Sequence, residues 1–208
     1  INKTNKFLFT SSGLKIPGKK NLCQTAYEAI KNKFDISPVH IHLHKLIPIG
    51  SGLGGGSSDA SFVLKGLNQI FNLKLSNSRL EKISKEIGAD CPFFIENKTK
   101  YVTGIGDKMK KINLDLSNYT IKLTHSNINI STANAFSNIK AHKQNIVTEN
   151  LSDLPIERWK NEVKNDFENN VFEIYPQLKI EKEKFYSEGA IYSSMTGTGS
   201  TIYGIFKK

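Results

Sequence analysis

Alternation of apolar and polar residues predicts several strands along the chain. In residues 38–47, Val39, Ile41 and Leu43 alternate with three histidines, a pattern typical of a half-buried strand. Residues 119–125 alternate in the same way. Strand-like runs at 190–194 and 201–206 lie on either side of a turn that is rich in threonine and glycine.

Apolar residues at helical spacing predict helices between these strands. One helix is expected from about Ser57 to Asn72. The run Ser78-Arg79-Leu80-Glu81 has the form of a capping box, so we expect another helix to start there and to end at Gly88. Further helical segments are predicted at 23–33, 132–139, 159–172 and 178–188, the last of which ends at Gly189.

The order of these elements is irregular, which favours an α+β fold over a strictly alternating βαβ fold. The chain has 208 residues, enough for one large domain or two small ones with a substantial core. Composition shifts little along it, and we expect one domain boundary near residue 117, which separates residues 1–117 from residues 118–208.

The composition excludes several classes of protein. Hydrophobic residues make up 38% of the chain and charged residues 23%, which argues against wholesale disorder. No apolar run approaches the roughly 20 residues of a membrane-spanning helix, and the first residues do not resemble a secretory leader. Cys23 and Cys91 are far apart, which excludes a disulfide scaffold and a cysteine-rich zinc site. We therefore expect a cytoplasmic protein without a membrane partner.

The chain is basic, with 29 Lys+Arg against 19 Asp+Glu and a net charge of +10. Such a charge invites a nucleic-acid-binding hypothesis. The lysines are, however, spread along the whole chain among Asn and Glu, without a run of five like charges, which favours a solvated surface. A positive field would also attract anionic small molecules such as nucleotides.

The glycine-rich segment before the helix at 57–72 is the most informative part of the chain. In order, its residues are Pro48, Ile49, Gly50, Ser51, Gly52, Leu53, Gly54, Gly55, Gly56, Ser57 and Ser58. Glycines let the backbone approach a ligand closely, and a helix N-terminus offers free N–H groups and a positive dipole end to a phosphate. Ser57 and Ser58 could cap the helix, bind a phosphate oxygen or ligate Mg²⁺. A flexible turn with an ordinary serine cap is the alternative, but it needs fewer glycines.

Three familiar phosphate-binding loops do not fit this segment. A Walker A loop requires a lysine after its last glycine, and none follows here. Gly50, Gly52 and Gly55 match GxGxxG, but residues 69–80 lack the acidic residue that a dinucleotide-binding fold would place there. A protein-kinase glycine loop would continue as a strand instead of a helix.

Two later segments also carry chemistry. Asp90 lies between a helix-ending glycine and Pro92, next to an apolar run, and is either a turn residue or a functional base. The run from Met195 to Thr201, MTGTGST, is either a hairpin turn or a second wall of the same site, with N–H groups and hydroxyls that face a phosphate or the substrate.

Together and in this order, these segments resemble the GHMP kinase superfamily, which includes the galactose, homoserine, mevalonate and phosphomevalonate kinases. The resemblance rests on Pro48-x-x-x-Gly52-Leu53-Gly54 followed by two serines, and it extends over residues 7–206. The runs GGGSSDA at 54–60 and GADCPFF at 88–94 resemble one branch in particular, whose members phosphorylate 4-diphosphocytidyl-2-C-methyl-D-erythritol.

The resemblance implies a two-domain α+β fold, with a ribosomal protein S5 domain 2-like N-terminal part and an α/β-plait C-terminal part. It also implies an ATP-dependent kinase that moves the γ-phosphate to the 2-hydroxyl of this substrate and yields the 2-phosphate and ADP. That reaction belongs to the methylerythritol phosphate route to isoprenoids. The implied cofactors are ATP and Mg²⁺, and the implied protein is a monomer or weak homodimer that binds a small molecule and no nucleic acid.

The resemblance assigns roles to individual residues. The segment from Pro48 to Ser58 would hold the ATP phosphates, with Ser58 as a candidate Mg²⁺ ligand. Asp90 matches the catalytic aspartate that takes the proton from the attacking hydroxyl, and Lys45 matches a lysine near the nucleotide. On the substrate side, Thr132 would lie near the diphosphocytidyl group and Phe136 would stack on cytosine, although a plain core role is the alternative for this phenylalanine.

The chain departs from the family's pattern at its start. It does not begin with Met, and it lacks the opening Pro-x-Lys-x-Asn-Leu strand, whose lysine pairs with the catalytic aspartate, and the Asp-Gly-Tyr-His type segment near cytidine. We therefore expect an N-terminally truncated sequence that, taken alone, folds poorly or has little activity. The competing hypotheses are another GHMP kinase, a nucleotide-binding remnant without catalysis, and a nucleic-acid-binding protein.

Overall fold

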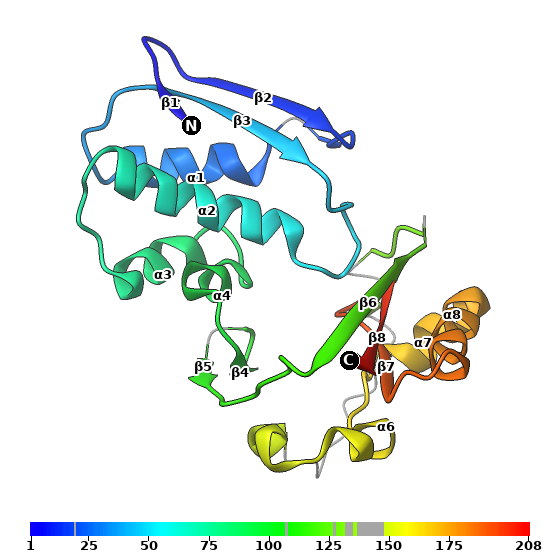
Figure 1. Ribbon diagram of the computed structural model, residues 1–208. Helices are drawn as coiled ribbons and strands as arrows, with labels where there is room; N and C mark the ends of the chain where they lie inside the picture. Colours follow the sequence, from blue (N-terminus) through cyan, green and yellow to red (C-terminus); the bar gives the residue numbers. More distant parts are fainter. Residues whose placement is uncertain (19, 107, 127, 132–134, 137–147) are drawn as a thin grey trace. The chain divides into compact units, whose positions relative to one another are not determined.

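The computed structural model describes the chain apart from residues 19, 107, 127, 132–134 and 137–147 (Figure 1). Its contacts divide the chain into two compact units. The N-terminal unit consists of residues 1–49 and 54–111, and the C-terminal unit of residues 50–53 and 112–208. The glycine-rich segment therefore passes from the first unit into the second at Gly50 and returns at Gly54.

The N-terminal unit combines a small sheet with helices (Figure 1). Its sheet has the order β1-β3-β2, in which β2 runs parallel and β1 antiparallel to the central strand β3. The strands are β1 (Asn2–Lys3), β2 (Leu8–Gly13) and β3 (Val39–Lys45), with a separate hairpin of β4 (Lys100–Thr103) and β5 (Lys108–Lys111). The helices are α1 (Leu22–Lys31), α2 (Gly55–Ile70), α3 (Asn77–Lys85) and α4 (Cys91–Glu96).

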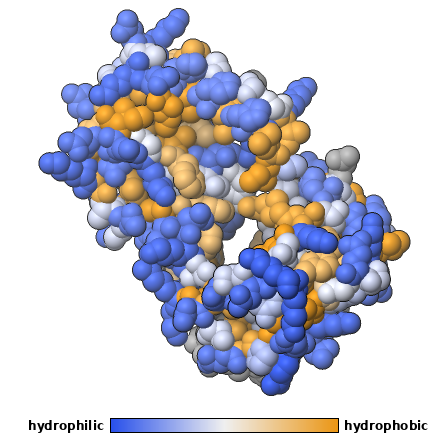
Figure 2. Space-filling view, viewed as in Figure 1, coloured by the Kyte–Doolittle hydropathy of each residue, from blue (hydrophilic) through white to orange (hydrophobic). Residues whose placement is uncertain are grey.

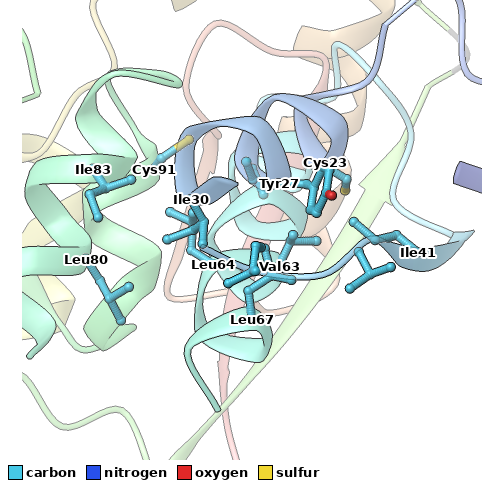
Figure 3. Packing of buried hydrophobic residues seen from close by; sticks show 14 of the residues in the cluster. Cys23, Tyr27, Ile30, Ile41, Val63, Leu64, Leu67, Leu80, Ile83 and Cys91 are labelled. Atoms are coloured by element: carbon cyan, nitrogen blue, oxygen red, sulfur yellow. The ribbon is translucent and has the colours of Figure 1, made fainter. Parts of the chain in front are cut away.

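One hydrophobic core holds this unit together, because α1, α2 and the inner face of β3 contribute apolar side chains to the same cluster. Figure 3 shows Ile30 of α1 beside Leu64 and Val63 of α2. Ile30 and Leu64 are fully buried. The alternation predicted for residues 38–47 is confirmed, since Val39 and Ile41 of β3 are buried in this core.

The outer face of β3 carries a continuous row of hydrogen bonds with its neighbour β2. Thr10 Oγ1 lies 2.8 Å from His40 Nε2 and 2.9 Å from His42 Nδ1. Ser12 Oγ lies 2.9 Å from His42 Nε2 and 2.9 Å from His44 Nδ1. The parallel register, which places Thr10 opposite His42 and Ser12 opposite His44, brings these side chains together. We call these five side chains the histidine row.

The C-terminal unit is built on an antiparallel sheet of order β6-β8-β7. Its strands are β6 (Tyr119–His125), β7 (Tyr192–Met195) and β8 (Thr201–Lys207), which confirms the strands predicted in these three places. The helices are α6 (Trp159–Glu162), α7 (Glu168–Ile174) and α8 (Pro176–Ser187), preceded by the 3-10 turns Thr148–Asp153 and Ile156–Arg158. Residues from α7, α8 and β8 share one core, and Trp159 lies in a second.

Three local predictions need correction. The capping residue of α3 is Ser76, which accepts a hydrogen bond from the Arg79 amide, so the helix starts before the expected box at Ser78. This helix also ends at Lys85, before Gly88. The single helix expected over 159–172 is two helices, because the backbone at Val163 is extended. The short helix expected over 132–139 lies largely outside the described residues.

The surface is chemically mixed. On the face shown in Figure 2, hydrophilic side chains are interspersed with apolar patches. Several basic residues also pair with acids on the surface of the N-terminal unit, for example Lys20 with Glu28 and Lys33 with Glu86. This arrangement agrees with the expectation that the lysines form a solvated surface.

Candidate active site

The N-terminus of α2 has no side-chain cap. Its N-cap is Gly54, with a left-handed φ of 64°, and it makes no side-chain capping bond. The first intrahelical bond in this turn runs from the Ser58 amide to the Gly54 carbonyl. The amides of the first turn that precede Ser58 are therefore not capped by a side chain and point toward the positive end of the helix dipole, where an anion is stabilised.

Ser57 and Ser58 are inside the first turn of α2, which excludes the alternative of an ordinary serine cap. The helix starts two residues earlier than Ser57, since a glycine in the left-handed region can end the preceding loop without a side-chain cap. Both serines are half-buried. Their roles in phosphate or Mg²⁺ binding stay predictions.

Lys45 packs against the N-terminal end of α2. Its side chain is buried, and its ammonium makes a 2.5 Å ion pair with Asp59 of α2. A Cβ atom on Gly55 would lie 3.1 Å from Lys45 Nζ and 2.8 Å from a methyl group of Ile47. The lysine thus packs against the start of the helix, and Gly55 leaves the room for it.

Asp90 lies beside the same helix. It is exposed, directly precedes α4 and makes no side-chain capping bond, so its carboxylate is not used to close the turn. The next residue, Cys91, is tied to α2 because the buried Ser61 hydroxyl donates to its carbonyl at 2.8 Å. A Cβ on Gly54 would meet the Phe94 ring at 2.8 Å. The structure therefore brings the Asp90 segment and the start of α2 together within the N-terminal unit.

In the C-terminal unit, the other part of the glycine segment packs against the turn between β7 and β8. The Thr196 hydroxyl donates to the Gly52 carbonyl at 3.0 Å, and the Thr201 amide donates to the Ser51 carbonyl at 3.2 Å. A Cβ on Gly52 would lie 2.1 Å from the Thr196 carbonyl oxygen. The predicted hairpin turn at 195–201 is present, and it also holds residues 50–53.

Of the two residues expected on the substrate side, Thr132 lies outside the described residues. Phe136 is 60% exposed and meets the Phe167 ring edge to face, with centroids 5.0 Å apart. Phe136 is therefore not the core residue that the alternative interpretation required.

Comparisons with known proteins agree with these segments. The model of the GHMP kinases N terminal domain matches residues 21–98, and the model of the GHMP kinases C terminal matches residues 149–208. The curated 4-diphosphocytidyl-2-C-methyl-D-erythritol kinase of Azobacteroides pseudotrichonymphae genomovar. CFP2 is 45% identical over 205 residues, which are 96% of the chain and 76% of that enzyme. The chain belongs to the GHMP kinase family.

Within this family, the similarity to one branch is repeated in a second organism. The 4-diphosphocytidyl-2-C-methyl-D-erythritol kinase of Cytophaga hutchinsonii is 46% identical over 202 residues, which are 96% of the chain and 75% of that enzyme. The chain thus spans about three quarters of the length of these relatives. The resemblance inferred from the motifs is confirmed, and the nucleic-acid-binding hypothesis gains nothing from these relatives.

Solved structures show the same fold. A crystal structure of 4-(cytidine 5'-diphospho)-2C-methyl-D-erythritol kinase matches with a TM-score of 0.79 and 24% identity, over 96% of the chain and 73% of that protein. Homoserine kinase from Cytophaga hutchinsonii matches with a TM-score of 0.73 and 15% identity, over all of the chain and 74% of that protein. The expected α+β GHMP kinase fold is confirmed.

Membership of the GHMP kinase family establishes that the protein uses ATP. In the part of the chain that the structure describes, no helix has the length and apolar character needed to cross a membrane. The two family models leave residues 99–148 between them, so the domain boundary near residue 117 stays a prediction.

The motifs alone did not identify Asp59 and Ser61 as parts of this GHMP kinase site. The signal for Asp59 was nevertheless present, because Lys45 continues the period of two set by Val39, Ile41 and Leu43 and must therefore face inward. A buried lysine requires a carboxylate partner. Ser61 carries no such signal, since its contact with α4 exists only in the folded chain.

The two cysteines provide a first testable prediction. Burial raises the pKa of the Cys23 thiol to about 12, helped by the nearby Asp59 carboxylate, and burial also raises the pKa of the Cys91 thiol. Because only the thiolate is nucleophilic, neither thiol should react with a disulfide reagent at pH 8 in the native protein. Both should react once guanidinium chloride unfolds it. Rapid modification of either cysteine in the native protein, located by mass spectrometry, would contradict this.

Proposed function

We propose that the protein transfers the γ-phosphate of ATP to the 2-hydroxyl of 4-diphosphocytidyl-2-C-methyl-D-erythritol, a step of isoprenoid synthesis by the methylerythritol phosphate pathway. One observation carries the proposal beyond the comparisons: the uncapped N-terminus of α2 lies beside the Asp90 segment, held there by the hydrogen bond from Ser61 to the Cys91 carbonyl. A phosphate-binding helix end and an exposed carboxylate at its side are what transfer to an alcohol requires.

The segment from Pro48 to Ser58 would hold the ATP phosphates through its backbone amides. Gly54 supports this role, because its glycine backbone starts the helix without a competing side chain. Lys45 would not contact the phosphates directly, since its ammonium is already paired with Asp59. In this arrangement the lysine fixes the start of α2 and adds positive potential there, and the amides make the direct contacts.

Mg²⁺ would arrive with the nucleotide. Within the described residues, no group of three His, Cys, Asp or Glu side chains could hold a metal ion by itself. Mg²⁺ commonly binds through one or two protein oxygens together with substrate phosphates and water, and the Ser58 hydroxyl suits that role. The ion would neutralise charge on the transferred phosphoryl group.

Asp90 would act as the general base. Its carboxylate takes the proton of the 2-hydroxyl, the hydroxyl oxygen forms a bond to the γ-phosphorus, and the bond from that phosphorus to the β,γ-bridging oxygen breaks. ADP leaves with the bridging oxygen. The exposed side chain of Asp90 makes no capping bond, so its carboxylate is accessible to a substrate.

Phe136 is proposed to stack on the cytosine of the substrate, which its exposed ring allows. Replacement of Phe136 by alanine should raise KM for the acceptor about tenfold, because base stacking on an aromatic ring contributes about 1–3 kcal/mol. Steady-state kinetics with each substrate varied in turn would measure this, and KM for ATP should change little. Phe136→Tyr is the matched control and should retain the wild-type KM; an equal rise for both variants would contradict stacking.

The decisive experiment is an ADP-release assay with protein expressed from its complete open reading frame. We expect turnover with 4-diphosphocytidyl-2-C-methyl-D-erythritol and none with homoserine or mevalonate. ATP binding without turnover on any acceptor would favour the nucleotide-binding remnant instead. We further propose a cytoplasmic location, which the two unpaired, buried cysteines support. We also propose a monomer or weak homodimer, and sedimentation would measure this assembly state.

A further inference from the structure

We propose that Asn165 and Glu168 are positioning residues that hold the turn between β7 and β8 against Gly52 and thereby raise the affinity for ATP. The inference rests on the proposed function, in which residues 48–58 bind the ATP phosphates. Every contact that carries it lies within the C-terminal unit.

Asn165 holds both sides of the turn. Its Nδ2 group donates to the carbonyl of Met195 at 2.8 Å and to the carbonyl of Gly197 at 2.8 Å. Its Oδ1 atom accepts from the Phe167 amide at 2.9 Å, which fixes the orientation of the side-chain amide. Both donors of one amide group are therefore used on the turn.

Glu168 anchors the strand that leads into the turn. Its side chain is only 7% exposed, and its Oε1 atom accepts from the Met195 amide at 2.8 Å and from the Ser194 hydroxyl at 2.9 Å. The other oxygen, Oε2, pairs with Lys182 Nζ at 2.5 Å. A buried carboxylate is costly unless it is paired and hydrogen-bonded, and here all of its partners lie in the same unit.

The turn transmits this anchoring to the glycine segment. Thr196 donates through its hydroxyl to the Gly52 carbonyl, and the Thr196 carbonyl approaches Gly52 so closely that a Cβ there would lie 2.1 Å away. The turn is itself closed by the Gly199 amide, which donates to the Thr196 carbonyl at 3.0 Å. A shift of the turn would therefore displace the backbone of Gly52.

The expected consequence is specific to the nucleotide. A loop that is ordered before binding loses less conformational entropy on binding, so its ligand binds more tightly. Loss of the Asn165 bonds should free the turn and weaken ATP binding. The bonds at issue are those from Asn165 to the Met195 and Gly197 carbonyls, whereas the bond from the Phe167 amide, whose ring meets Phe136, should persist, so KM for the acceptor should change little.

The test compares three single variants. Asn165→Asp has nearly the same size and keeps the bond from the Phe167 amide, but it replaces the Nδ2 group and its two N–H donors by one carboxylate oxygen that faces two carbonyls. Loss of two neutral hydrogen bonds corresponds to about a tenfold rise in KM and Kd for ATP. Glu168→Ala removes the acceptor of the Met195 amide and the Ser194 hydroxyl, so it should raise KM and Kd for ATP by a similar factor.

Val171→Ala is the control for general destabilisation. Val171 is buried on α7, the helix of Glu168, and belongs to the hydrophobic core without a side-chain hydrogen bond to the turn, so this variant should lower the melting temperature without changing KM for ATP. Calorimetry with ATP provides a Kd that does not depend on turnover, and KM for the acceptor should stay constant in all three variants. Faster amide exchange at Gly199 and Thr201 in Asn165→Asp would report the freed turn.

The outcomes separate the two proposals. An Asn165→Asp protein with unchanged Kd for ATP, or a rise in Kd equal to that of Val171→Ala, would overturn the positioning role. If the unaltered protein binds ATP but phosphorylates no acceptor, the proposed function fails, and the Kd values still decide the positioning role. Failure of the unaltered protein to bind ATP would overturn both.

Discussion

Replacement of Asp90 by asparagine should lower kcat about 10²–10⁴-fold, the usual contribution of a general base. The amide is the same size as the carboxylate but cannot take the proton of the attacking hydroxyl. Because Asp90 is exposed and makes no capping bond, the substitution should leave the melting temperature and the Kd for ATP near their original values. Steady-state and single-turnover kinetics, together with calorimetry for ATP, would measure the three quantities.

A matched control for Asp90 is Glu86→Gln in the same unit. Glu86 forms an exposed ion pair with Lys33, and such pairs contribute about 0–1 kcal/mol to stability, so kcat should not change. Comparable kcat values for Asp90→Asn and the unaltered protein would exclude Asp90 as the base. A fall in kcat accompanied by an equal loss of ATP affinity would indicate damage to the phosphate site instead.

Replacement of Gly52 by alanine should destabilise the protein by about 3 kcal/mol and lower kcat/KM for ATP about 100-fold. Two causes act together. The backbone at Gly52 has a φ of 75°, which a side chain disfavours, and the new Cβ would lie 2.1 Å from the Thr196 carbonyl oxygen. Backbone atoms cannot rotate away as a flexible side chain would, so either the turn or the loop must move. Thermal unfolding and ATP-dependent kinetics would measure the two effects.

Gly56→Ala is the control for folding, because a Cβ at Gly56 would meet only a Leu22 methyl group, at 3.5 Å. Gly56 lies in the first turn of α2, where alanine has the higher helix propensity, so its melting temperature should stay the same or rise. If Gly52→Ala unfolds at the temperature of the unaltered protein and keeps its kcat/KM for ATP, the turn does not restrain the loop.

The sequence predicted the strands best, for a reason that the structure makes clear. Apolar and polar residues alternate over 39–45 because one face of the strand packs on helices and the other does not. The local sequence pattern therefore reflects the tertiary packing. The helix expected over 159–172 failed because the pattern does not register hydrogen bonds from distant segments. The Val163 carbonyl accepts from the Tyr192 hydroxyl, and Asn165 binds the turn, which interrupts the helix between α6 and α7.

The candidate site was predictable where a motif is contiguous. The glycine segment and Asp90 could be assigned because neighbouring residues define them, and their roles stay predictions until tested. The roles of Asp59, Ser61 and Glu168 depend on partners that lie far away in the sequence and that only folding brings close. These partners are Lys45, Cys91 and Met195 respectively. The start of α2 was expected about two residues late, at Ser57, because the left-handed conformation of Gly54, which starts the helix, cannot be read from local preference.

The hydrogen bonds of the histidine row couple the positions of its hydrogen atoms. A neutral imidazole has one N–H, and each hydroxyl has one hydrogen, so His42 can donate either to Thr10 or to Ser12 but not to both. When His42 donates to Thr10, full use of every hydrogen requires Ser12 to donate to His42 and His44 to donate to Ser12. The opposite choice reverses every bond. The remaining ring nitrogens at the two ends of the row therefore always differ, one with a proton and the other with a lone pair, and the whole row changes polarity as one unit.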